Sequence, residues 1–199
     1  MNVSQKMVRV LVSESPDKQT QQVLTLSVDQ LMGLLETDHG LHEIIPMCDP
    51  DCLVRPFFDV DISGGDLDSG SVLDTVLTRL NIVFDCGDES WAIASRCRPE
   101  KISFHLVGHT RAVSLRELRH LAAGEDLKDL VDDTVYWPPL WNVREEGSFC
   151  LPNQSKDGIN KEGGPLIILQ GSLRDFLVTE VTGRLVETMG AEDTSSNSH

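Results

Sequence analysis

No stretch of this chain is apolar for long enough to cross a bilayer. The most apolar windows, residues 31–35 and 166–169, are only a few residues long, whereas a membrane-spanning helix needs about 20. The first residues also lack the charged and then apolar pattern of a secretory signal peptide. We therefore expect neither membrane insertion nor secretion, and an intracellular location.

Positive charge is also scarce. The sequence has 17 Lys and Arg against 32 Asp and Glu, which gives a formal net charge of −15. This balance argues against a protein that grips nucleic acid mainly through its global field. The segment 96–119 is an exception, because it holds six Lys or Arg against two Glu. It is either a basic strip on an acidic body or a solvated surface whose arginines pair with neighbouring acids.

Cysteines are few and odd in number. The five cysteines form no dense framework, and reduced thiols in an intracellular compartment are the simpler interpretation. Cys48 and Cys52 lie near two histidines, but their spacing matches no strong zinc template. We therefore assign no zinc site.

The 199 residues, 40% of them hydrophobic, are enough for one substantial folded domain. Strands are expected where apolar residues alternate or gather between turn-forming stretches, at residues 7–13, 55–62, 91–95, 101–107, 134–136 and 149–151. A polar loop is expected after residue 13. Helices are expected at the capping signals of Ser27, Ser71 and Ser114, the first ending near Gly40 and the third near Gly124. After residue 166 the pattern fits either a strand or a helix.

Strands mixed with helices predict an α+β domain, with α/β as the alternative. We expect residues 1–40 to form an N-terminal strand and helix portion of the domain. Residues 41–189 would form the core. Residues 190–199 are small and polar, which predicts a disordered tail.

Two predicted strands carry most of the candidate chemistry. Alternate residues of a strand share a face, so Asp59 and Asp61 point the same way. Lys101, Ser103 and His105 also share a face, opposite the apolar residues between them. A carboxylate pair and a Lys/Ser/His face suggest a metal-bound phosphate site. Taken singly, His105 is more typical of a hydrogen-bonded core histidine, and Lys101 of a surface lysine.

Two carboxylates two residues apart along a strand are separated by about 6.6 Å of rise, and can bracket a hard divalent cation. A third acid is usually needed. Asp132, directly before a predicted strand, is the best candidate, and Asp133 is the alternative. Three such carboxylates can hold Mg²⁺ or Mn²⁺ together with a triphosphate.

The order of these motifs resembles the archaeo-eukaryotic primase superfamily, and most closely its primase-polymerase branch of eukaryotes and large DNA viruses. The likeness covers roughly residues 41–179. It rests on Arg-Pro-Phe-Phe-Asp59-Val-Asp61, Ser95-Arg96, Lys101-Ile-Ser103-Phe-His105-Leu, Asp132-Asp-Thr-Val-Tyr136 and Phe149-Cys-Leu-Pro-Asn-Gln-Ser-Lys156. Three motifs in order, each with a strand context, make coincidence an inferior explanation.

The resemblance implies an enzyme, a DNA-directed nucleotidyltransferase that makes DNA or RNA on a template, in replication or in damage-tolerant priming. Its core would be an RNA-recognition-motif-like mixed sheet with flanking helices, joined to a small N-terminal α/β portion. It implies that Mg²⁺ or Mn²⁺ binds Asp59, Asp61 and Asp132. The nucleotide's phosphates would bind four residues: Lys101, Ser103, His105 and Lys156. The implied partners are a single-stranded DNA template, nucleoside triphosphates, and a replicative helicase or single-strand-binding protein. The implied location is the nucleus, or a viral replication site.

One departure from the family pattern concerns phosphate binding. The family usually carries an arginine shortly before its final lysine, and that position is Cys150 here. Arg144 is a candidate to compensate. Two other functions therefore stay open: a catalytically weak relative that binds nucleotide or DNA within a replication complex, and an unrelated metal-dependent phosphodiesterase.

Overall fold

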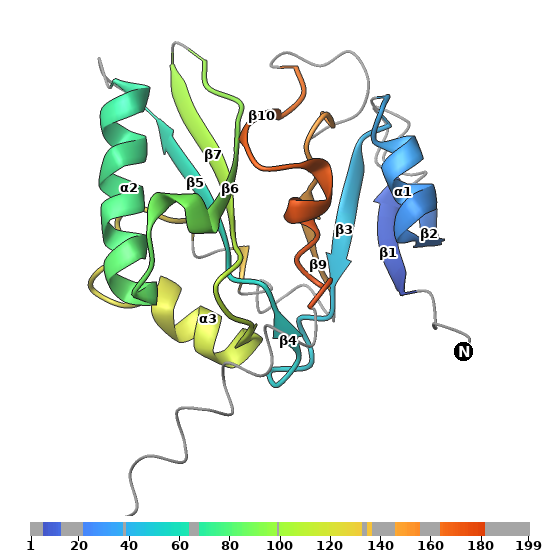
Figure 1. The fold of residues 1–199 in the computed structure, drawn as a ribbon, viewed down its shortest axis with the longest axis horizontal. Helices are drawn as coiled ribbons and strands as arrows, with labels where there is room; N and C mark the ends of the chain where they lie inside the picture. The colour runs from blue at the N-terminus through green and yellow to red at the C-terminus, as the bar shows by residue number, and fades with distance from the viewer. Residues whose placement is uncertain are drawn as a thin grey trace, which may run out of the picture.

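The computed structural model describes residues 6–12, 22–37, 39–63, 68–98, 100–132, 135–136, 146–155 and 164–181. Two four-stranded sheets form its frame (Figure 1). In the first sheet the order is β2 (Gln22–Ser27), β1 (Met7–Val12), β3 (Leu41–Ile45) and β9 (Gly147–Cys150). In the second it is β10 (Ile167–Gln170), β6 (Trp91–Ser95), β7 (Lys101–Gly108) and β5 (Phe57–Ser63). A small ribbon pairs β4 (Leu53–Val54) with β8 (Val113–Ser114).

The expected α+β class is confirmed, but the expected mixed sheet is not found. Every described strand pair is antiparallel. Strands β5 and β7 are neighbours that run in opposite directions. The chain between them includes a helix and strand β6. Strands from both sides of residue 40 share the first sheet, because β1 pairs with β3.

Three α-helices are described: α1 (Val28–Leu34), α2 (Ser69–Phe84) and α3 (Leu115–Ala122). Ser27 caps α1 in a capping box with Gln30, as predicted, although the helix ends well before Gly40. Ser114 caps α3, which ends just before Gly124. The cap of α2 is Asp68 rather than Ser71, since the Asp68 carboxylate accepts the backbone N–H of Ser71 at 2.8 Å. No helix in the described parts of the chain is long and apolar enough to span a membrane.

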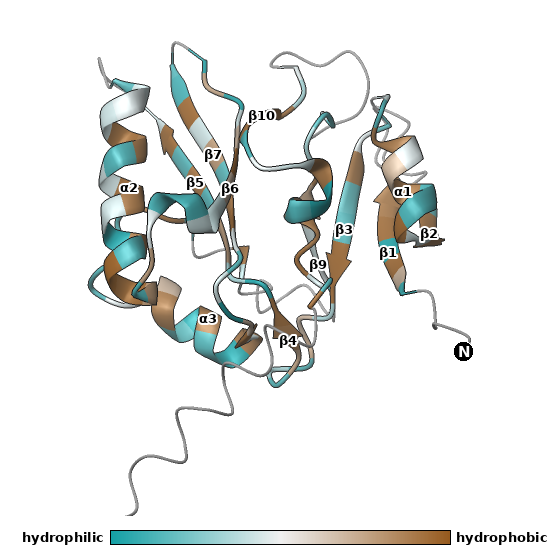
Figure 2. Ribbon diagram, in the orientation of Figure 1, coloured by the Kyte–Doolittle hydropathy of each residue, from teal (hydrophilic) through white to brown (hydrophobic). Residues whose placement is uncertain are grey.

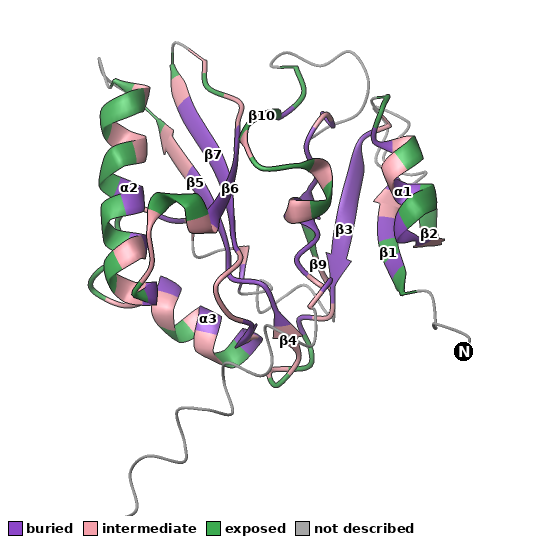
Figure 3. Ribbon diagram, viewed as in Figure 1, coloured by how far each residue is buried: buried purple, intermediate pink, exposed green. Residues whose placement is uncertain are grey.

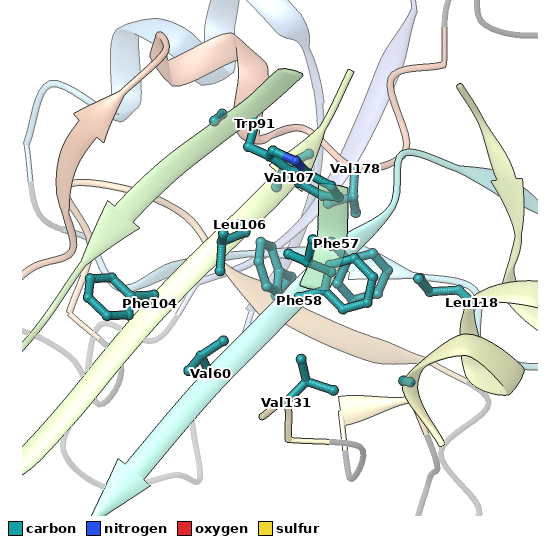
Figure 4. Close-up of a cluster of buried hydrophobic side chains, with 14 of the residues drawn as sticks. Phe57, Phe58, Val60, Trp91, Phe104, Leu106, Val107, Leu118, Val131 and Val178 are labelled. Carbon is teal, nitrogen blue, oxygen red and sulfur yellow. The ribbon is translucent and has the colours of Figure 1, made fainter. Parts of the chain in front are cut away.

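Helix α2 covers one face of the second sheet. Its Phe84 packs against Phe58 of β5 and Trp91 of β6, with ring centroids 5.9 and 5.4 Å apart. Figure 4 shows Phe58 with Phe104 and Leu106 of β7 in this core. Hydrophobic and hydrophilic residues alternate along β5 and β7 (Figure 2). The polar residues of these strands therefore face away from α2.

The opposite face of the second sheet is also covered, which buries most of β7 (Figure 3). Strand β9 of the first sheet reaches it, because Phe149 stacks on the ring of His105 with centroids 4.5 Å apart. The 3-10 helix η3 (Leu173–Phe176) contacts both β7 and α1. The polar residues of β5 and β7 thus lie where the two sheets meet.

Four strands were not expected from the sequence: β2, β3 and the two short strands β4 and β8 of the ribbon. Strand β2 occupies part of the predicted polar loop, and β3 precedes the strand expected at residues 55–62. All five residues of β3 are buried, including His42 and Glu43. Their polar side chains break the apolar run that would otherwise indicate a buried strand.

Buried Glu43 joins β3 to the end of the described chain. Its carboxylate accepts the backbone N–H groups of Val178 and Thr179, at 2.7 and 3.0 Å, and the Thr179 hydroxyl. Burial raises the pKa of Glu43, although the bonds from Thr179 and Val178 act in the opposite direction. The open question about the segment after residue 166 is resolved in favour of a short strand, β10, followed by η3.

The expected strand at 134–136 is wrong for the two of its residues that are described. Val135 and Tyr136 lie in a tight turn, in which the Val135 N–H donates to the Asp132 carbonyl. Tyr136 is fully buried against Phe57, and its hydroxyl donates to the Phe57 carbonyl. This long-range anchor bends the chain over β5 and overrides the local preference of Val and Tyr for a strand.

Candidate metal and nucleotide site

The polar face of the second sheet is organised in two rows. Asp59 of β5 pairs with His105 of β7, and Asp61 pairs with Ser103. Directly paired residues of antiparallel strands project on the same side of the sheet. The alternation predicted for each strand gathers its polar residues on one face. The register between β5 and β7 then places the two carboxylates beside an imidazole and a hydroxyl.

Asp132 brings a third carboxylate to the first two. Its backbone N–H donates to the Asp59 carbonyl at 2.7 Å, so its position is tied to β5. One side-chain oxygen from each of Asp59, Asp61 and Asp132 lies within 4.8 Å of the others. The predicted convergence of these three carboxylates is therefore present in the structure.

This donor set suits a hard divalent cation. Oxygens on opposite sides of one Mg²⁺ ion are about 4.2 Å apart, because each lies about 2.1 Å from the metal. Adjacent oxygens on one octahedral Mg²⁺ ion are closer, about 3 Å apart, so the three oxygens, which lie within 4.8 Å of one another, must move inward to bind a single ion. Three carboxylates without softer ligands favour Mg²⁺ or Mn²⁺ over zinc.

His105 is held on three sides. Its Nε2 lies 3.4 Å from Asp59 Oδ1, its Nδ1 lies 3.1 Å from the Cys150 carbonyl, and its ring stacks on Phe149. A carbonyl can only accept, so Nδ1 donates. Burial lowers the pKa of His105, but the charge and hydrogen bond of Asp59 outweigh it and leave the pKa above 6.5.

Lys101 and Ser103 complete the candidate phosphate-binding face. Lys101 Nζ donates to Asp61 Oδ2 at 2.8 Å, and the lysine side chain is partly exposed. Ser103 is 9% exposed, and its hydroxyl forms no hydrogen bond with the described residues, so it is available to donate to a ligand. The cations are thus close to the acids, in an arrangement that an incoming metal would change.

Several predicted site residues lie outside the described parts of the chain. These are Lys156, the alternative ligand Asp133 and the compensating candidate Arg144. Cys150 is described and buried. Its sulfur lies 3.6 Å from Nη2 of Arg96, which also donates to the Gln154 carbonyl at 2.6 Å.

Arg96 is the residue that sequence reasoning left without a role. The sequence did carry a signal for this residue. Arg96 directly follows Ser95 at the end of a strand that pairs with β7, so alternation along the strand indicates which face of the sheet it occupies. Other arginines of the segment 96–119 are engaged within the fold. Arg111 pairs with Glu117 and Arg116 with Asp51, which matches the solvated-surface interpretation for these two.

A separate hollow of about 540 Å³ opens elsewhere on the surface, lined among others by Trp91, His109 and Asp175. None of the three site carboxylates lines it. The three carboxylates form a specific donor set for a cation, whereas the hollow is open to solvent.

No family model matches the chain, and the search of curated proteins gives no significant match.

Proposed function

We propose that the chain is the catalytic core of a primase-polymerase, which transfers nucleotides to a growing strand on a single-stranded DNA template. The observation that carries the proposal is the convergence of Asp59, Asp61 and Asp132 beside the Ser103 and His105 face. Convergence of three acids from two separate segments with phosphate-type donors is much more specific than an Asp-x-Asp pair alone.

In the proposed reaction a 3′ hydroxyl attacks the α-phosphorus of a nucleoside triphosphate. The new P–O bond forms as the bond to the β-phosphate breaks, pyrophosphate leaves, and the hydroxyl proton passes to solvent. Divalent metals at the carboxylates would favour loss of that proton and stabilise the leaving pyrophosphate. The three carboxylates would hold the metals in position.

The cationic face has the complementary role. Lys101 and His105, now paired with Asp61 and Asp59, would turn to the phosphates once metal ions neutralise the acids. Ser103 would donate a hydrogen bond to a phosphate oxygen. Preorganised donors of this kind stabilise charge where it develops in the transition state. Lys156, a replicative partner protein and a nuclear or viral location remain predictions of the resemblance.

A catalytically weak relative is the second candidate. It is favoured by Cys150, a neutral residue where the family pattern expects an arginine, and by the net charge of −15. Such a protein would bind nucleotide or DNA without making a product.

One assay separates these functions. The protein is incubated with a single-stranded template, Mn²⁺ and labelled nucleotides of both sugar types, and products are resolved by length. We expect extended products from the wild type, none from Asp59→Asn, and normal amounts from Asp126→Asn. Asp126 is a suitable control because it is an exposed acid paired with Arg79. Nucleotide binding without product would favour the weak relative, and shortening of the template would favour a phosphodiesterase.

A further inference from the structure

Arg96 extends the polar face of the second sheet by one strand. Its backbone N–H donates to the Ser103 carbonyl at 3.0 Å, which continues the register in which Ser95 pairs with Phe104. Arg96, Ser103 and Asp61 therefore form a row across three neighbouring strand positions. Because adjacent strands lie about 4.8 Å apart, the backbone at the basic end of this row is about 10 Å from the backbone at the acidic end.

No acidic side chain among the described residues neutralises the positive charge of Arg96. Its guanidinium contacts two neutral groups, the Gln154 carbonyl and the Cys150 sulfur. Its Nε is buried without a hydrogen-bond partner, and no carboxylate of the described residues pairs with it. A guanidinium offers five donors. Arg96 thus keeps donors and a full charge for an anion, whereas Arg111 and Arg116 have acids as partners.

The surroundings of Arg96 favour a phosphate over a carboxylate side chain as that anion. Ser103 and His105 lie between Arg96 and the metal-type acids. An anion that spans this row must be long, with its first part at the carboxylates and its last part at the guanidinium. A triphosphate tail has this form, and a planar guanidinium fork matches phosphate oxygens in two-point contacts.

On the basis of the proposed function, we propose that Arg96 binds the terminal phosphate of the incoming nucleoside triphosphate. Its guanidinium lies against the sulfur of Cys150. The positive charge at this place is therefore supplied by Arg96, after the end of β6, instead of by an arginine at position 150 of β9. This assignment makes Arg96 the residue that distinguishes triphosphates from diphosphates.

The test measures binding rather than turnover. Affinities for ATP, ADP and AMP, and for the three deoxyadenosine counterparts, are measured by calorimetry with Mn²⁺ and without template. We expect Arg96→Gln to weaken triphosphate binding about tenfold or more, the range for a lost charge-assisted hydrogen bond, and to leave diphosphate binding nearly unchanged. Arg116→Gln, which removes a charge from an exposed ion pair, should bind like the wild type.

A second variant guards against a folding defect. Arg96→Gln retains an amide donor for the Gln154 carbonyl, and thermal unfolding checks that the variant is folded. If it is not, Arg96→Lys is used, and its triphosphate-to-diphosphate ratio should also fall because a point charge replaces the fork.

The outcomes separate the two proposals. An unchanged triphosphate-to-diphosphate ratio in a folded variant overturns the role of Arg96 and leaves the proposed function standing, provided that the wild type binds triphosphate. Weaker binding of a single-stranded oligonucleotide with an unchanged ratio would assign Arg96 to the template backbone instead, and also overturns the inference. A wild type that binds none of these nucleotides refutes both proposals.

Discussion

His105 and Asp59 are direct cross-strand partners, with Nε2 of the imidazole 3.4 Å from Oδ1 of the carboxylate in a buried site. Burial lowers the pKa of this histidine, and Asp59 raises it by charge and by hydrogen bonding. In the absence of metal, Asp59 therefore favours the protonated form of His105. The titration of this histidine can be measured before any substrate binds.

The first prediction concerns that pairing. In Asp59→Asn the pKa of His105 should fall below its wild-type value, because burial and the charge of Arg96 are then opposed only by weaker effects. The imidazole titration is followed by NMR in the presence of a chelator. An equal pKa in the two proteins would show that Asp59 does not control His105. The Asp126→Asn protein, altered at an exposed ion pair, is the control.

Lys101 is expected to oppose metal and to favour nucleotide. Its ammonium lies 2.8 Å from Asp61 Oδ2, so a metal must displace it. Replacement by methionine should tighten Mn²⁺ binding several-fold without nucleotide, since a partly exposed ion pair is worth about 1 kcal/mol or less. The same variant should bind a triphosphate more weakly.

These two affinities are measured by calorimetry on the same preparations. Lys128→Met removes a surface charge paired with Glu125 and should alter neither. A change of both Lys101→Met affinities in the same direction would argue against competition between the lysine and the metal.

Tyr136 is expected to stabilise both the fold and the position of Asp132. Its hydroxyl donates to the Phe57 carbonyl inside the core, and burial raises its pKa well above 10, with contributions from Asp59 and Asp132. Tyr136→Phe should lower the free energy of unfolding by about 1–3 kcal/mol. It should also weaken Mn²⁺ binding, because the turn that carries Asp132 loses its anchor.

The control for Tyr136 is a core change on the far side of the sheet. Leu80 of α2 is fully buried, and Leu80→Ala should cost about 2–5 kcal/mol with normal Mn²⁺ affinity. Urea unfolding and Mn²⁺ titration give the two quantities. Equal metal affinity in wild type and Tyr136→Phe would limit Tyr136 to a role in stability.

Glu43 gives a prediction for pH. Its pKa is raised in the folded protein, so the folded state holds this proton more tightly than the unfolded chain. The contribution of Glu43 to stability is therefore full below its ordinary pKa near 4.5 and is lost as the pH rises through the folded value. Stability curves of the wild type and Glu43→Gln should reveal this dependence.

Glu43→Gln should be destabilised, because an amide NH₂ would face a backbone N–H where a carboxylate oxygen now accepts. The difference in unfolding free energy between the two proteins should be largest near pH 4.5 and should shrink toward pH 8. A difference that is constant over this range would contradict the raised pKa.

Much of the candidate site follows from local sequence. Strand alternation predicted that Asp59 and Asp61 share a face of their strand and that Lys101, Ser103 and His105 share a face of theirs. The register of β5 with β7 places both sets on the same side of the sheet. The caps at Ser27 and Ser114 were also found where expected. These features depend on neighbouring residues and on the period of the strand, which a single sequence displays directly.

Other features have no local signal. The approach of Asp132 was proposed from its residue type and its place directly before a predicted strand, but it is achieved by a hydrogen bond to β5 and by the buried Tyr136. The same anchor made the predicted strand at 134–136 wrong. Strand β3 was missed because the buried His42 and Glu43 interrupt its apolar run, and Glu43 finds its partners far away in the chain.

The sequence alone therefore determined the chemical character of each strand face, since side-chain direction alternates with a period of two wherever the backbone is extended. Tertiary structure alone decided which faces meet. Contacts such as Arg96 with Cys150, or His105 with Phe149, join segments more than 40 residues apart, and only the pairing and packing of whole sheets can specify them.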